Sequence, residues 1–138
     1  MKIMDALVDQ AQYALDSIRG FVESIDGIYV NYTADKFAAI IPLPESQKIQ
    51  KVFGAINEDK ERVEFYAMVC QKLRVDFEKL SEVQRSFTYS RFIKEEGSIL
   101  LFASISLESV SYSILSEVVM EVAENAAEWE KKLKEELV

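Results

Sequence analysis

Apolar residues recur every three or four positions along the first 25 residues of the chain, with polar and acidic residues between them. The apolar members of this pattern are Ile3, Leu7, Ala11, Ala14, Leu15, Ile18, Phe21, Val22 and Ile25. This period is typical of an amphipathic helix that turns one apolar stripe towards a core. The pair Asp26-Gly27 predicts the end of the helix, because these residue types tolerate a positive φ.

A period of two replaces the helical period after Gly27, which predicts extended strands. The predicted strands cover residues 28–33, 37–41, 49–56 and 62–71. Prolines follow the second segment and polar turns follow the first and third. The links are too short for helical crossovers, so the four segments predict an antiparallel meander.

The second half of the chain predicts a short helix, a hairpin and a long helix. Asp76 is expected to cap the short helix. Two strands follow, over 87–93 and 98–107, and a glycine supplies the positive φ of the turn between them. The run 99–102 is apolar on both faces, which places it inside the sheet. An apolar stripe over 114–137 predicts the last helix.

The order of elements is α-β(3-4)-α-β(2)-α, in a single domain over residues 1–138. Each helix has one apolar stripe, and three helices on one face of an antiparallel sheet bury all three stripes in two layers. The predicted fold class is therefore α+β, a two-layer sandwich with five or six strands and helices on one face. A chain of 138 residues can bury such a core without disulfides or metals.

The second face of this sheet is more apolar than the water-facing side of an antiparallel sheet normally is. In the strand 62–71, Tyr66, Met68 and Cys70 lie opposite the core-facing residues. Such a face indicates a bound partner, unless loops or the last helix cover it. The candidate interface residues are Tyr29, Tyr66, Met68, Tyr89 and Phe92.

The composition removes the commonest catalytic and metal-binding chemistries. The chain has no histidine, which is the usual general acid–base and the usual zinc ligand. The single cysteine, Cys70, is expected to be a buried small hydrophobe. The row Glu117, Glu121, Glu124 and Glu128 is expected to be a solvated helix face. With no phosphate loop or nucleophile motif, no catalytic, cofactor-binding or metal-binding residue is predicted.

The net charge of −8 argues against nucleic acid and membrane surfaces as partners, because phosphates repel an acidic domain. Phe87, Tyr89 and Phe92 alternate with Arg85 and Arg91 as in a base-stacking platform, but no basic stripe surrounds them. No apolar run approaches the roughly 18 residues of a membrane span, and no signal-peptide pattern appears. The expected compartment is the cytoplasm.

The segment 77–92 resembles the short helix and the following strand of the YbjN family, in the sequence FEKLSEVQRSFTYSRF. The continuation is similar as well, with Glu96-Gly97 as a turn, 99–101 as a strand and 107–110 as the entry to a long helix. The first half matches in the order of elements. These domains share the fold of type III secretion chaperones. The resemblance implies an α-β(3)-α-β(2)-α sandwich that often dimerises and binds other proteins, with no catalytic residues. The fourth strand predicted in the meander departs from that pattern.

The sequence therefore predicts a non-catalytic protein-interaction domain, chaperone-like or regulatory, that binds a segment of a partner protein and forms a homodimer. The alternative is a small-molecule-binding domain with an apolar pocket between the helices and the sheet. An enzyme with a carboxylate-based site is a weaker interpretation, because no carboxylate falls in the predicted core stripes. No cofactor is expected in the leading interpretation.

Overall fold

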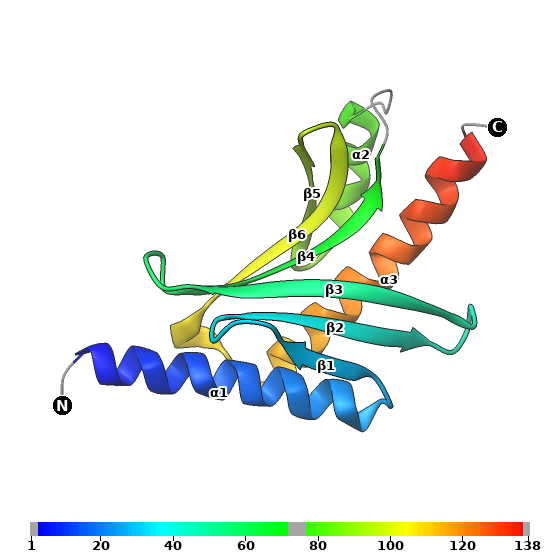
Figure 1. Cartoon of the computed structure of the whole chain (residues 1–138). Helices are drawn as coiled ribbons and strands as arrows, with labels where there is room; N and C mark the ends of the chain where they lie inside the picture. The colour runs from blue at the N-terminus through cyan, green and yellow to red at the C-terminus, as the bar shows by residue number, and fades with distance from the viewer. Residues whose placement is uncertain (1–2, 72–76, 137–138) are drawn as a thin grey trace.

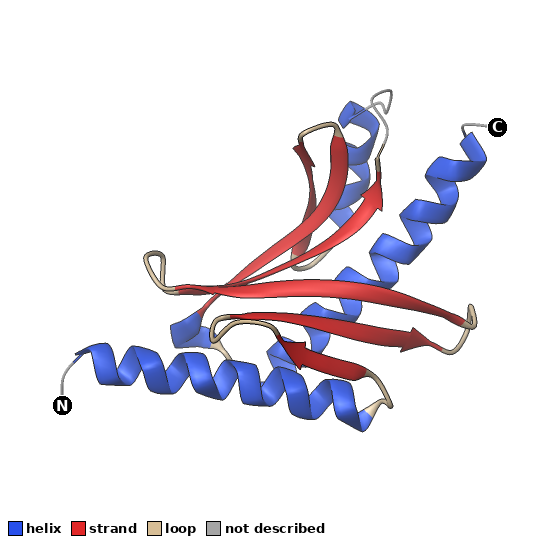
Figure 2. Cartoon of the chain, viewed as in Figure 1, coloured by secondary structure: helices blue, strands red, loops and turns tan. Residues whose placement is uncertain are grey.

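The computed structural model describes residues 3–71 and 77–136 and contains one six-stranded sheet with helices packed against it (Figures 1 and 2). In chain order the elements are α1 (Ile3–Ser24), β1 (Ile28–Asn31), β2 (Lys36–Leu43), β3 (Lys48–Asn57), β4 (Arg62–Cys70), α2 (Phe77–Val83), the 3-10 turn η1 (Gln84–Ser86), β5 (Ser90–Glu95), β6 (Ser98–Ser106), the 3-10 turn η2 (Leu107–Ser109) and α3 (Tyr112–Glu136). The predicted α+β class and element order are confirmed, with four strands in the meander.

All strand pairs are antiparallel, and the strand order in the sheet is β1-β2-β3-β4-β6-β5. β6 pairs on both sides, as its apolar run predicts. In the turn that joins β5 to β6, Glu96 has a φ of 49° and Gly97 a φ of 81°. Two successive positive φ values suit the twist of a tight hairpin. At the end of α1, Asp26 takes the left-handed conformation, with a φ of 61°.

One face of the sheet is buried beneath the helices. α3 packs across β4, β3 and β6, whereas α1 lies against α3 and beside β1 and β2. In β2, Phe37, Ala39 and Ile41 alternate with less buried residues, and Val63 and Phe65 do the same in β4. This alternation follows the period of a strand and gives a single core between sheet and helices.

The first residues of β5 depart from the prediction. The strand begins at Ser90 rather than at residue 87, after the turn η1. The backbone amides of Thr88, Tyr89 and Ser90 donate to the carboxylate of Glu121 on α3, at 2.7–2.8 Å. Because these amides donate to a side chain, no strand begins at residue 87. The prediction that Glu121 is merely solvated is wrong for the same reason.

The helices fit the predicted amphipathic pattern in the described residues. Leu80 of α2 is buried against the core, whereas the predicted cap Asp76 lies outside the described residues. The described stretches of α1, α2 and α3 include no helix with the length and apolar character needed to cross a membrane.

Candidate protein-binding site

The outer face is the side of the sheet opposite the helices. Strand pairing sets Phe53 of β3 opposite Tyr66 of β4, and Tyr66 opposite Phe102 of β6. Met68 and Leu100 form the next pair on the same side. The rings of Tyr66 and Phe102 stack, with centroids 6.1 Å apart and an angle of 19°. These five side chains form the apolar centre of the outer face, in which Phe53 and Met68 remain 37% and 38% exposed.

The charges on the outer face differ in sign from the chain as a whole. Strand register places four basic side chains and two carboxylates on this face. They are Lys36, Lys51, Arg62 and Arg91, and Glu64 and Glu95. The Arg91 guanidinium lies 5.4 Å from the centroid of the Phe102 ring, and Arg62 donates to the hydroxyl and carbonyl oxygens of Ser104. On a chain of net charge −8, the outer face therefore carries an excess of positive charge.

β3 and β4 pair along only part of their length. The pairing joins residues 53–57 of β3 to residues 62–66 of β4. Beyond it, residues 48–52 pair with β2 and residues 67–70 follow β6, so the two strands diverge (Figure 1). This gap between residues 48–52 and 67–70 is called the split. It divides the sheet into two ribbons at one end.

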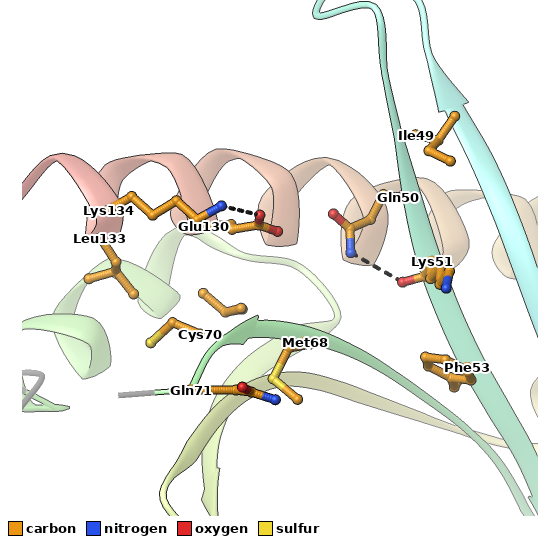
Figure 3. A pocket seen from close by; sticks show the side chains of 11 residues that line it. Ile49, Gln50, Lys51, Phe53, Met68, Cys70, Gln71, Glu130, Leu133 and Lys134 are labelled. Atoms are coloured by element: carbon orange, nitrogen blue, oxygen red, sulfur yellow. Dashed lines mark hydrogen bonds and ion pairs between the residues drawn. The ribbon is translucent and has the colours of Figure 1, made fainter. Parts of the chain in front are cut away.

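A cavity of about 640 Å³ opens at the split. Its lining from the two strands and from α3 includes Ile49, Lys51, Phe53, Met68, Cys70, Glu130, Leu133 and Lys134 (Figure 3). The Gln50 side chain donates to the carbonyl oxygen of Lys51 at 3.2 Å. Lys134 forms an ion pair with Glu130 at 2.9 Å. The cavity therefore combines an apolar lining with polar groups from β3 and α3.

Two of the predicted interface residues, Tyr66 and Met68, lie together on the outer face. Burial, followed by the nearby carboxylate of Glu64, raises the pKa of the Tyr66 hydroxyl. Tyr29 lies on the helix-covered face, because it pairs with Ala39, and its ring stacks on Phe37 at 5.3 Å. The candidate Tyr29 therefore does not share the outer face with Tyr66.

The other two candidates, Phe92 and Tyr89, lie near α3. Phe92 is 3% exposed and packs between Phe87 and Trp129, with ring centroids 5.6 Å and 5.9 Å away. Tyr89 is partly exposed, and its hydroxyl donates to Glu117 at 2.5 Å, which raises the pKa of that hydroxyl. These two residues thus join the hairpin to α3 and do not extend the apolar centre.

Sequence reasoning missed Phe53, Phe102 and the split. The exposure of Phe53 could have been predicted, because the period of a strand places it on the same face as Ile49, which is also exposed. The split has no local signature, since it depends on where two strands stop pairing. Cys70, predicted to be buried, is partly exposed at the cavity, beside the bulge at the end of β4.

No protein-family model matches the chain, and no curated protein matches it significantly. A chain of the ExsC–ExsE complex aligns with a TM-score of 0.63 and 16% identity, over 88% of this chain and 93% of that chain. A chain of the HopA1–SchA chaperone–effector complex aligns with a TM-score of 0.63 and 10% identity, over 95% and 98%. At these identities the likeness shows the fold alone, and it supports the chaperone-like fold that the resemblance implied.

Proposed function

We propose that this chain is a non-catalytic, chaperone-like domain that binds an extended segment of a partner protein on its outer face. The observation that carries the proposal is the apolar centre around Phe53, Tyr66 and Met68, which the described parts of the helices leave uncovered. Apolar faces of sheets are normally packed against another layer. The likeness in fold to chains of the ExsC–ExsE and the HopA1–SchA chaperone–effector complexes supports the same role.

The proposal also includes self-association into a homodimer and a cytoplasmic location. The outer face is a poor contact between two copies, because each copy would present the same excess of positive charge. The edge strand β1 is better suited. Its side chains Ile28 and Val30 lie at the free edge of the outer face, because Val30 pairs with Ala38 and Ala38 pairs with Phe53, and they are 56% and 52% exposed. Tyr32 beyond the strand is 54% exposed. We therefore assign self-association to the β1 edge and segment binding to the apolar centre of the outer face.

The test of segment binding uses a photo-crosslinking amino acid at position 53, in the apolar centre. The captured partner is identified by mass spectrometry, and its affinity is then measured for the wild-type chain and for Tyr66→Gln/Met68→Gln. We expect the double variant to bind at least about tenfold more weakly, a loss of about 1.4 kcal/mol. Tyr13→Gln is the matched control, because Tyr13 is 48% exposed on α1. Equal affinity for all three proteins would contradict the proposal.

Small-molecule binding is the second candidate function, and the cavity at the split is the observation that favours it. Its volume of about 640 Å³ lies within the usual range of ligand pockets. Native mass spectrometry of the purified chain distinguishes the two functions. A bound mass of a few hundred daltons that Leu133→Gln removes would support the small molecule, and an unliganded mass would oppose it.

A further inference from the structure

We infer that the split between β3 and β4 accepts one short extended segment of a partner polypeptide as an added strand, with carboxylates alternating with apolar side chains. This inference rests on the proposed function and specifies where the segment enters the sheet and which residues it carries. Strand addition usually occurs at the outer edge of a sheet. In this protein the split provides two further edges inside the sheet.

The β3 side of the split presents backbone groups that pair with no strand among residues 3–71 and 77–136. The Ile56 amide donates to the Asp35 carbonyl on the β2 side, at 2.8 Å. Backbone groups alternate in direction along a strand, so those of Ile49 and Lys51 point towards the split. The Gln50 side chain already donates to the Lys51 carbonyl, as a strand neighbour would (Figure 3). This edge is therefore set up for backbone pairing.

The β4 side presents a shorter matching edge. Tyr66 is its last residue paired with β3, and the same alternation turns the backbone groups of Met68 towards the split. A bulge between Met68 and Cys70 then bends the end of β4. The two edges run antiparallel, so an inserted strand would be parallel to one and antiparallel to the other. Five residues of β3 and four of β4 limit the insertion to a short segment.

The side chains around the split define the chemistry of the segment. Alternate residues of a strand point to opposite faces. Side chains of the inserted segment that point towards α3 would contact Leu133, which is 4% exposed, and Val69, which is 1% exposed. Those that point outward would lie among the exposed side chains of Ile49, Phe53 and Met68 and beside the ammonium group of Lys51. That ammonium group has no ion pair in the described part of the chain, so a carboxylate beside it would gain a partner. Apolar side chains fit the first set, and carboxylates fit the second.

The test uses synthetic peptides of about eight residues, a typical strand length. One peptide alternates valine with aspartate and a second alternates valine with lysine. Binding is measured by fluorescence anisotropy, and amide exchange of the wild-type chain by NMR. We expect the acidic peptide to bind at least about tenfold more tightly and to slow exchange of the Ile49 and Lys51 amides by at least about tenfold. Failure of the acidic peptide to bind would overturn the inference.

Two variants separate the roles of charge and backbone. Lys51→Glu is expected to reverse the preference between the peptides, whereas Lys36→Glu, on the same face but away from the split, is expected to keep it. Ile49→Pro removes an amide that faces the split, keeps the Lys51 ammonium group, leaves the pairing with β2 intact and is expected to weaken binding about tenfold or more. If Ile49→Pro does not fold, amide exchange in the wild-type chain decides.

The outcomes also separate this inference from the proposed function. Peptide binding that protects amides of β1 or β5, and leaves those of Ile49 and Lys51 unchanged, would overturn the split as the site. Segment binding by the chain would then stand. The proposed function fails on different evidence, namely when Tyr66→Gln/Met68→Gln binds the captured partner as the wild-type chain does.

Discussion

Gly54 of β3 lies directly under the ring of Phe37 in β2. The two residues are partners in the strand register, and a Cβ at position 54 would lie 2.1 Å from Cζ of Phe37. The Phe37 ring is fully buried and also contacts Phe65, at 6.1 Å, and Tyr29, at 5.3 Å. The absence of a side chain at Gly54 therefore makes room for the aromatic cluster of Tyr29, Phe37 and Phe65.

We expect Gly54→Ala to lower the free energy of unfolding by about 2 kcal/mol, because the added methyl group overpacks a fixed ring. Urea denaturation measures this change. Gly20→Ala is the matched control, since its Cβ would meet only Tyr112 Cε2 at 4.0 Å. That control should stabilise the helix by about 1 kcal/mol. A stabilising effect at both positions would show that the Phe37 ring moves aside without cost.

The Tyr29 hydroxyl is buried and has no hydrogen-bond partner among the described residues. We expect Tyr29→Phe to raise the free energy of unfolding by roughly 1 kcal/mol, because it removes an unpaired polar group and keeps the ring. Urea denaturation at neutral pH measures the change. A marked loss of stability would mean that the hydroxyl has a partner, such as a bound water.

Burial also raises the pKa of Tyr29 above its ordinary value of 10.0. The folded chain thus holds this proton more tightly than the unfolded chain. The stability linked to this proton is fully present below pH 10.0 and falls as the pH rises through the folded pKa. Unfolding measured across this alkaline range should therefore depend less steeply on pH in Tyr29→Phe than in the wild-type chain. Equal slopes would contradict this interpretation.

At the residue scale, Tyr29 shows what the period of a strand does not determine. A period of two separates the two faces of a strand but does not state which face the helices cover. Register fixes that choice, since Tyr29 pairs with the buried Ala39, whereas Tyr66 pairs with the half-buried Phe102. The sequence therefore predicted Tyr66 and Met68 correctly as neighbours on the second face, and misplaced Tyr29.

At the scale of elements, one carboxylate joins the β5 edge to α3. Glu121 accepts hydrogen bonds from the amides of Thr88, Tyr89 and Ser90 and from the Ser90 hydroxyl. Hydrogen bonds to an ionised acceptor are about twice as strong as neutral ones. The carboxylate thus fixes the start of the hairpin against the last helix.

We expect Glu121→Ala to lower the free energy of unfolding by about 2 kcal/mol, because four donors lose their acceptor. Amide exchange should quicken most at Ser90, the first residue of β5. Glu124→Ala, on the same helix, is the control, since Glu124 is exposed and forms no ion pair in the described part of the chain. Uniform loosening of the whole sheet in Glu121→Ala would contradict a local anchor.

The elements themselves were predictable because each has a strong local pattern. The stripes of α1 and α3, the meander and the Gly97 turn all follow from residues that are neighbours in sequence. The start of β5 and the split do not. The first depends on Glu121, some thirty residues further along the chain, and the second depends on the divergence of two strands. Such long-range contacts leave no local period to detect.

At the scale of the whole molecule, charge is segregated between the layers. The outer face carries an excess of basic side chains, although the net charge of the chain is −8. The excess of carboxylates therefore lies elsewhere, as on α3, where Glu117 and Glu128 are exposed or half-exposed. An acidic segment is attracted to the outer face, and a second outer face is repelled by it. The outer face therefore suits an acidic segment and does not suit contact with a second outer face.

This segregation predicts that segment binding and self-association respond to different changes. Val30→Lys places a charge on the apolar β1 edge, a common means of preventing strands from associating. We expect it to convert the homodimer into a monomer and to leave segment binding intact, whereas Tyr66→Gln/Met68→Gln should do the reverse. Light scattering coupled to gel filtration measures the mass. Val30→Thr is the matched control, because threonine keeps the shape and the strand preference of valine.

The salt dependence of segment binding and of self-association provides an independent test that the two use different surfaces. From about 0.01 M to about 1 M salt, the screening length falls from about 30 Å to about 3 Å. Binding of an acidic segment to the outer face should weaken over this range, because its attraction is screened. A dimer held at the apolar β1 edge has no such attraction to lose, and the screening of two chains of charge −8 should strengthen it. A wild-type chain that is monomeric at every concentration would contradict self-association. A dimer that only Met68→Lys dissociates would place the contact at the apolar centre of the outer face instead of the β1 edge.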